Sequence, residues 1–160
     1  MTTEVSVAQT SAQTVATWRT QTTHTSIFND IPMGLGRVVG HLTEAGIDPA
    51  GLPFTLYHQA PDGDTIGDIA VAIPVTPGTE TGADGDIVIV DMPAQVEAAV
   101  LHVGSYDNMG ESYAAVVGWI HQHGHNIVGP SREIYLNSPH DAAEHELRTQ
   151  ILFPIDAEVN

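Results

Sequence analysis

The chain has 160 residues, of which 42% are hydrophobic, so it can bury a core, and a disordered or fibrous protein is excluded. Twenty acidic residues face only 4 basic ones, and the formal net charge of -16 repels phosphate backbones, so we expect no direct nucleic-acid contact. The chain has no cysteine, no visible signal peptide and no apolar run long enough to span a bilayer; we expect a soluble cytoplasmic protein without membrane contact.

The first half of the chain combines extended and helical patterns. Residues 4–22 are rich in threonine and valine and predict extended structure. A helical period begins at Ile31, with Asn29 or Asp30 expected as N-cap and Gly46 as the C-terminal stop. Two short strands are expected to follow, over Phe54–His58 and Ile69–Val75. A polar loop ending near Gly85 closes this half.

The second half repeats this order of patterns. Strands are expected over Ile87–Val90 and Gln95–Val103, joined by a tight turn at residues 91–93. A helix with apolar positions from Met109 to Ile120 is expected to be capped by Asp107 and stopped by Gly124. The last expected strands are Glu133–Leu136 and Leu147–Phe153.

The two halves match at a shift of 78 residues, because helix, glycine stop, turn and strand coincide and Tyr57 falls on Tyr135. Repeats that cannot cover their own apolar faces pack against each other. We therefore predict one domain over residues 1–160 with an internal repeat, about 1–78 and 79–160. The fold class is α+β: two pseudo-symmetric strand–helix–strand–strand modules, an antiparallel sheet with both helices on one face, and a cleft between the modules.

Glu133 is the leading candidate for chemistry. Strand alternation places it on one face with Ser131 and Tyr135, while Arg132 lies on the other face. A carboxylate beside aromatic rings is suited to binding a cation through direct charge and cation–π contact. The alternative, which residue type alone favours, is that Glu133 pairs with an arginine at the sheet edge. Thr55 stands at the equivalent position of the first half, so the duplication is not symmetric here.

Several motifs in chain order resemble the GyrI-like family, the small-molecule-binding or effector-binding domain of AraC- and MerR-type regulators. In the second half they are Leu101–Tyr106, Tyr113, Trp119-Ile120, Gly129–Leu136 and Thr149–Ile155. In the first half they are Gly51–Tyr57 and Asp68–Val75. The resemblance covers essentially the whole chain and implies the same two-module architecture.

The resemblance implies a cleft for bulky, aromatic and often cationic small molecules, in which Glu133 meets the positive charge. The resemblance also implies that four aromatic side chains form the wall of this cleft: Tyr57, Tyr106, Trp119 and Tyr135. Gln150 completes the expected ligand-binding set, although the family often has a glutamate there. The regulators carry a helix-turn-helix domain before this one and nothing here precedes residue 4, so we do not expect a complete transcription factor.

Three functions remain open. The first is binding or sequestration of a hydrophobic, aromatic and cationic effector or drug. The second, which similar stand-alone proteins suggest, is hydrolysis of strained cyclopropane rings in DNA-alkylating natural products; Glu133 would activate water and Tyr135 would donate to the developing oxyanion. The third is protein binding, with gyrase or a regulator as partner. The oligomeric state, monomer or homodimer, is left open.

The histidines His121, His123 and His125 have metal-ligand spacing, but Gly124 is expected to end the helix between them. We predict no specific metal site and no cofactor.

Two further motifs suggest chemistry that the sequence does not support. Asp62, Asp64 and Asp68 are spaced as in a calcium loop, but Ile73 stands where the bidentate glutamate is needed, which favours a turn. Ser105 and His102 could form a nucleophile and its base, but no oxyanion-hole motif accompanies them.

Overall fold

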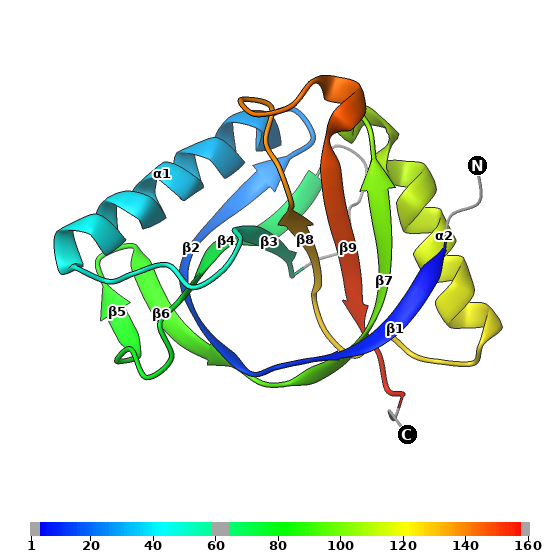
Figure 1. Cartoon of the computed structure of the whole chain (residues 1–160), viewed down its shortest axis with the longest axis horizontal. Coiled ribbons are helices and arrows are strands. Elements are labelled where there is room, and N and C mark those ends of the chain that lie inside the picture. Colours follow the sequence, from blue (N-terminus) through cyan, green and yellow to red (C-terminus); the bar gives the residue numbers. More distant parts are fainter. Residues whose placement is uncertain (1–3, 59–64, 158–160) are drawn as a thin grey trace. The chain divides into compact units, whose positions relative to one another are not determined.

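The computed structural model describes residues 4–58 and 65–157 (Figure 1). The chain divides into two compact units. The α1 unit is residues 12–93, and the α2 unit combines residues up to Ser11 with those from Ala94 onward. Each unit contains an antiparallel sheet and one long helix, so the predicted α+β class is confirmed. Because the first strand belongs to the α2 unit, neither unit is a single half of the chain.

The α1 unit has five antiparallel strands in the order β3-β4-β2-β6-β5. In chain order its elements are β2 (Gln13–Thr23), α1 (Ile27–Ala45), β3 (Phe54–Tyr57), β4 (Thr65–Val75), β5 (Gly82–Asp84) and β6 (Ile87–Met92). The strand β5 was missed because its three residues read as part of the polar loop. Asp62 and Asp64 lie outside the described residues.

Helix α1 begins earlier than predicted. Its N-cap is Ser26, and neither Asn29 nor Asp30 caps it. Ser26 and Thr23 exchange hydrogen bonds between backbone N–H groups and side-chain oxygens at 3.1 Å, which fixes the entry into the helix. Asp30 accepts a 2.7 Å hydrogen bond from Thr22, so its carboxylate ties the first turn to β2. Gly46 ends the helix in the left-handed conformation, as predicted.

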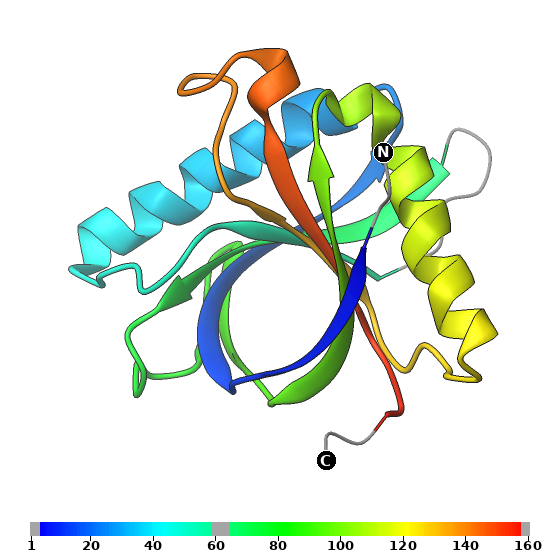
Figure 2. The same ribbon diagram turned by 45° about the vertical axis from the view of Figure 1, so that its right-hand side comes forward.

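The α2 unit has four antiparallel strands in the order β1-β7-β9-β8. Its elements are β1 (Val5–Thr10), β7 (Gln95–Val103), a short 3-10 helix η1 (Tyr106–Asn108), α2 (Met109–Gln122), β8 (Ser131–Tyr135), a second 3-10 helix η2 (Glu144–Glu146) and β9 (Arg148–Pro154). Helix α2 packs on β7 and β9 (Figure 2). A tight turn was expected at residues 91–93; β6 instead continues through Asp91 to Met92, which pair with Thr14 and Gln13 of β2.

The predicted cap of α2 is also corrected. Asp107 lies inside η1, where its backbone N–H donates to the Ser105 side chain, and Asn108 is the N-cap of α2. Sequence alone did not show the extra 3-10 turn, because three polar residues before a helix fit a cap equally well. Gly124 adopts φ 72°, so the predicted stop is present two residues after the helix ends.

Features that the predicted repeat places in correspondence occur in both units. Val38 and Leu42 are buried beneath α1, and Val116 and Ile120, 78 residues later, are buried beneath α2. Each unit also has an isolated β-bridge at a corresponding place: Pro49 pairs with Val75, and Ile127 pairs with Ile155. Gly51 and Gly129 approach the rings of Pro74 and Pro154 in the same way, so a Cβ would lie 3.1 Å and 3.2 Å from the respective Cγ atoms. Within the described residues, no helix is long and apolar enough to cross a bilayer.

Candidate functional site

Glu133 is a buried carboxylate on β8, with only 7% of its surface exposed. Directly paired residues of antiparallel strands project to the same face of a sheet. Glu133 pairs with Ile151, which packs in the core with Val116 and Ile120 of α2. The carboxylate therefore lies on the face of the sheet that α2 covers.

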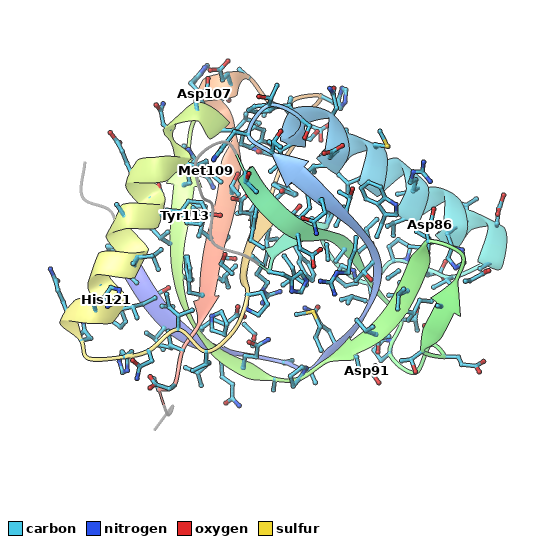
Figure 3. The ribbon with its side chains drawn as sticks, turned by 180° about the vertical axis from the view of Figure 1, so that it is seen from behind. Asp86, Asp91, Asp107, Met109, Tyr113 and His121 are labelled. Carbon is cyan, nitrogen blue, oxygen red and sulfur yellow. The ribbon has the colours of Figure 1, made fainter. Side chains whose placement is uncertain are left out.

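Two tyrosine hydroxyls meet this carboxylate. Tyr113 of α2 donates a hydrogen bond to Oε2 of Glu133, and the hydroxyl of Tyr135 lies 3.4 Å from Oε1. Figure 3 shows Tyr113 on the side of α2 that faces the strands. Its ring packs edge-on against Phe153 of β9, with centroids 5.9 Å apart, so the phenol is held by packing as well as by its hydroxyl.

Two tyrosines near Glu133 have raised pKa values. Burial raises the pKa of Tyr113 well above its ordinary value of 10, and the negative charge and the hydrogen bond of Glu133 raise it further. Burial and the same carboxylate also raise the pKa of Tyr106. Tyr106 and Tyr113 thus stay neutral at physiological pH beside the buried carboxyl group of Glu133.

The structure separates the predicted site residues into two groups. Tyr106 and Tyr135 lie near Glu133, as their contacts and electrostatics show. Trp119 instead stacks on His123 and His125 at the C-terminal end of α2, with ring centroids 4.0 Å and 5.9 Å apart.

Gln150 and Tyr57 are placed differently again. Gln150 pairs with Ile134, so it projects from the sheet face opposite to that of Glu133. Tyr57 belongs to the α1 unit, where it packs against the core beneath α1. The position equivalent to Glu133 is Thr55, whose side chain is fully buried. Of the two modules, the α2 unit alone therefore carries an acid at this position.

Sequence reasoning did not select Tyr113 as a site residue. Tyr113 lies on the apolar face of the predicted helix, and this pattern predicts an aromatic side chain that packs in the core. One signal was available: at a shift of 78 residues Tyr113 corresponds to Leu35, so the hydroxyl appears only in the module that also carries the acid.

Arg132, the strand neighbour of Glu133, is held on the opposite face. Its guanidinium donates to both carboxylate oxygens of Glu97, at 2.6 Å and 3.2 Å, and both side chains are buried. The hydroxyl of Thr10 also donates to Glu97, at 2.8 Å. This arginine therefore serves a buried ion pair with Glu97 of β7.

The other candidate motifs are not assembled for catalysis or tight metal binding. His102 contacts the backbone carbonyl of Ser105, while the Ser105 hydroxyl accepts from Asp107. His123 places Nδ1 against the Trp119 carbonyl oxygen, and His125 lies 3.8 Å from Asp156. In the part of the chain that the structure describes, no three histidine, aspartate or glutamate side chains converge as a metal site requires. The absence of a bound metal or cofactor stays a prediction.

Two hollows on the protein surface are lined by residues other than Glu133 and its tyrosines. One, of about 330 Å³, lies between α1 and the β5–β6 turn and is lined by Arg37, His41 and Asp86 among others. The other, of about 460 Å³, lies at the β8–β9 connection beside Asp141, His145 and Arg148. Neither Glu133 nor its tyrosines line these hollows, and neither combines an apolar wall with a buried charge.

The chain belongs to the GyrI-like family: the sequence model of the GyrI-like small molecule binding domain matches residues 3–156. The search of curated proteins finds no match. Among solved structures, the C-terminal domain of EcmrR superposes with a TM-score of 0.83 at 22% identity, covering 99% of this chain and 100% of that domain. In EcmrR as seen in its complex with DNA, the match covers 98% of this chain but 58% of that protein, at 21% identity and a TM-score of 0.83.

Two further structures share the fold. A hydrolase from Listeria innocua, encoded by lin2189, has a TM-score of 0.68 at 11% identity, with 96% of this chain and 92% of that one covered. SAV2435, solved with tetraphenylphosphonium bound, has a TM-score of 0.60 at 18% identity, with 96% and 94% covered. At these identities the likeness establishes the fold, and the chemistry must be argued from this chain's own residues.

Proposed function

We propose that this protein binds a hydrophobic, aromatic and cationic small molecule at Glu133, with Tyr106, Tyr113 and Tyr135 contacting its rings. The observation that carries the proposal is the buried carboxylate beneath α2, whose two oxygens face the hydroxyls of Tyr113 and Tyr135. The binding of tetraphenylphosphonium by SAV2435, a protein of the same fold, adds support by analogy.

The chemistry favours a cation for three reasons. A carboxylate removed from water is costly to keep ionised, and a positive ligand reduces that cost directly. Phenol rings attract cations through their negative faces, by about 0.5–2 kcal/mol for each close contact. A neutral ligand gains only the apolar burial, so the site discriminates by charge.

Isothermal titration with tetraphenylphosphonium tests the proposal. Glu133→Gln keeps the shape of the side chain and removes its charge, so affinity should fall by roughly 1.5–3 kcal/mol, about 10- to 150-fold, which is the attraction between two unit charges about 6–10 Å apart at an effective dielectric constant of about 20. Triphenylphosphine oxide, a neutral aryl compound, should lose far less affinity on the same substitution.

The matched control is Glu111→Gln, which makes the same change of charge at an exposed position of α2. It should leave tetraphenylphosphonium binding within about two-fold of the wild type, because exposed charges are screened by salt. Equal losses in both variants would mean that the net charge of the chain, and not a site at Glu133, attracts the cation.

A second function, hydrolysis of strained cyclopropane rings, has one observation in its favour. A carboxylate hydrogen-bonded to neutral phenols offers a general base and general acids in one place. Glu133 could take a proton from a water molecule as its oxygen bonds to a ring carbon. The ring C–C bond then breaks, its electron pair moves to the conjugated carbonyl oxygen, and Tyr113 or Tyr135 donates a proton to that oxygen. For an enzyme, Glu133→Gln should leave substrate binding largely intact and reduce turnover of a carbonyl-conjugated cyclopropane by roughly 100-fold or more. Absence of turnover in the wild type would leave binding as the function.

A further inference from the structure

A buried histidine lies near this site with both ring nitrogens engaged. His102, on β7, is 5% exposed. Its Nε2 lies 2.8 Å from the backbone carbonyl oxygen of Ser105, and its Nδ1 lies 2.8 Å from the hydroxyl oxygen of Ser112, which is 7% exposed. His102 thus connects the strand to two points of the segment that forms η1 and α2.

The partners define the tautomer of the neutral ring. A carbonyl oxygen can only accept, so Nε2 carries the hydrogen and donates to Ser105. Nδ1 is then an acceptor, and the Ser112 hydroxyl donates to it. One rigid ring therefore supplies a donor and an acceptor at fixed separation.

Each contact immediately precedes a tyrosine of the site. Ser105 comes directly before Tyr106, and its hydroxyl accepts from the Asp107 N–H at 3.1 Å, which fixes the first turn of η1. Ser112 comes directly before Tyr113, which donates to Glu133. Displacement of either serine would therefore displace the ring that follows it.

We infer that His102 is a positioning residue that holds Tyr106 and Tyr113 beside Glu133. The inference rests on the proposed function only in regarding these tyrosines as ligand contacts. The comparison of the units supports it: by strand register the counterpart of His102 is Thr20, which pairs with Ile69 as His102 pairs with Thr149, and Gly34 stands in place of Ser112, so the same bridge cannot form in the unit that lacks the acid.

Substitutions can separate the two halves of this bridge. In His102→Gln the side-chain amide reaches the place of Nε2 and can still donate to Ser105. In His102→Asn the shorter amide reaches the place of Nδ1 and can still accept from Ser112. Ser112→Ala removes the second contact alone, and His102→Leu removes both while keeping an apolar side chain in the core.

The readout is the ultraviolet titration of the phenols, which needs no ligand. The chain has 4 tyrosines, and Tyr106→Phe and Tyr113→Phe assign their individual transitions. We expect His102→Gln and Ser112→Ala to move the Tyr113 transition toward pH 10 and leave that of Tyr106 in place. His102→Asn should move the Tyr106 transition toward pH 10 and leave that of Tyr113 in place. His102→Leu should move both transitions toward pH 10. His123→Gln, at the exposed end of α2, is the control and should move neither.

Two results would overturn the inference. One is a folded His102→Leu protein, with wild-type far-ultraviolet circular dichroism, in which both phenols titrate as in the wild type. The other, decisive even if His102→Leu does not fold, is that His102→Gln and His102→Asn move the same tyrosines, since a role in stability alone would not distinguish the two contacts.

Tetraphenylphosphonium binding provides the functional readout. In each variant whose tyrosine titration is shifted, the affinity for tetraphenylphosphonium should fall at least five-fold. Selective phenol shifts in a protein whose wild type binds no tetraphenylphosphonium would contradict the proposed function and support the positioning role of His102. Undiminished affinity in variants with shifted phenols would contradict the role of these tyrosines in binding.

Discussion

Tyr113 of α2 donates its hydroxyl hydrogen to Oε2 of Glu133 on β8, 20 positions later in the chain. This contact joins the helix to the strand through the buried acid, so helix position and acid environment depend on each other. It also makes the protonation of the phenol a measurable reporter of the site.

Glu133→Gln should lower the pKa values of both Tyr113 and Tyr106, but leave them above 10. The reason is that burial is the largest single cause of each increase and persists in the variant, which removes only the charge of Glu133. Phenolate absorbance measured against pH checks this. A return of Tyr113 to an ordinary titration would show that the charge of Glu133, and not burial, dominates.

The same phenols predict how stability depends on alkaline pH. A tyrosine with a raised pKa in the folded state keeps its proton after the unfolded chain has lost it at about pH 10. Above that pH the unfolded state binds fewer protons, so the free energy of unfolding should decrease as pH rises toward the folded-state pKa. Urea unfolding between pH 9 and 11 measures the slope, and Tyr113→Phe should reduce it; an unchanged slope would contradict the assignment.

Glu97→Gln should destabilise the protein by about 3–5 kcal/mol, because it removes the carboxylate that binds the buried Arg132 guanidinium. Asp86→Asn is the control, because Asp86 and its partner Arg37 are both exposed. The loss of stability in this variant should stay below about 1 kcal/mol. Urea unfolding of both variants gives the two numbers. Similar small losses would mean that the buried pair contributes no more than a surface pair.

Gly34→Ala should destabilise the protein by about 1–3 kcal/mol, since a Cβ there would lie 2.5 Å from the Trp18 ring and 2.9 Å from Val71. Gly36→Ala, two residues later on the exposed side of α1, meets nothing within 4 Å and should stabilise it by about 0.5–1 kcal/mol. Opposite shifts of the melting temperature are the expected outcome. Stabilisation by both alanines would show that α1 is packed less tightly on β2.

Thr149→Val should be neutral or stabilise the protein by about 1 kcal/mol. Thr149 is 1% exposed, and within the described part of the chain its hydroxyl oxygen has no hydrogen-bond partner. Valine has the same shape without the polar atom, so it removes an unmet desolvation cost. Thr149→Ser keeps the hydroxyl, loses a methyl group and should destabilise the protein. A clear loss of stability in the valine variant would mean that the hydroxyl makes a bond that matters.

The sequence predicted most elements because local patterns determine them. Gly46 and Gly124 stop their helices as expected, since glycine readily adopts positive φ. The helix starts were predicted less well: Ser26 and Asn108 are the N-caps, and the sequence favoured neighbouring residues. Adjacent polar side chains can each cap a helix, and the contacts of Thr23 and Ser105 decide between them.

The sequence by itself predicted the internal repeat, and it determined the family and the face of β8 that Glu133 shares with Tyr135, because these depend on spacing along the chain. It did not determine that Tyr113 meets Glu133, that Trp119 stacks on histidines, or that Gln150 lies on the opposite face. Those outcomes depend on which side of α2 packs on the sheet and on the register between β8 and β9. Periodicity fixes which residues of one element share a face, but only tertiary packing decides which face of the next element they meet.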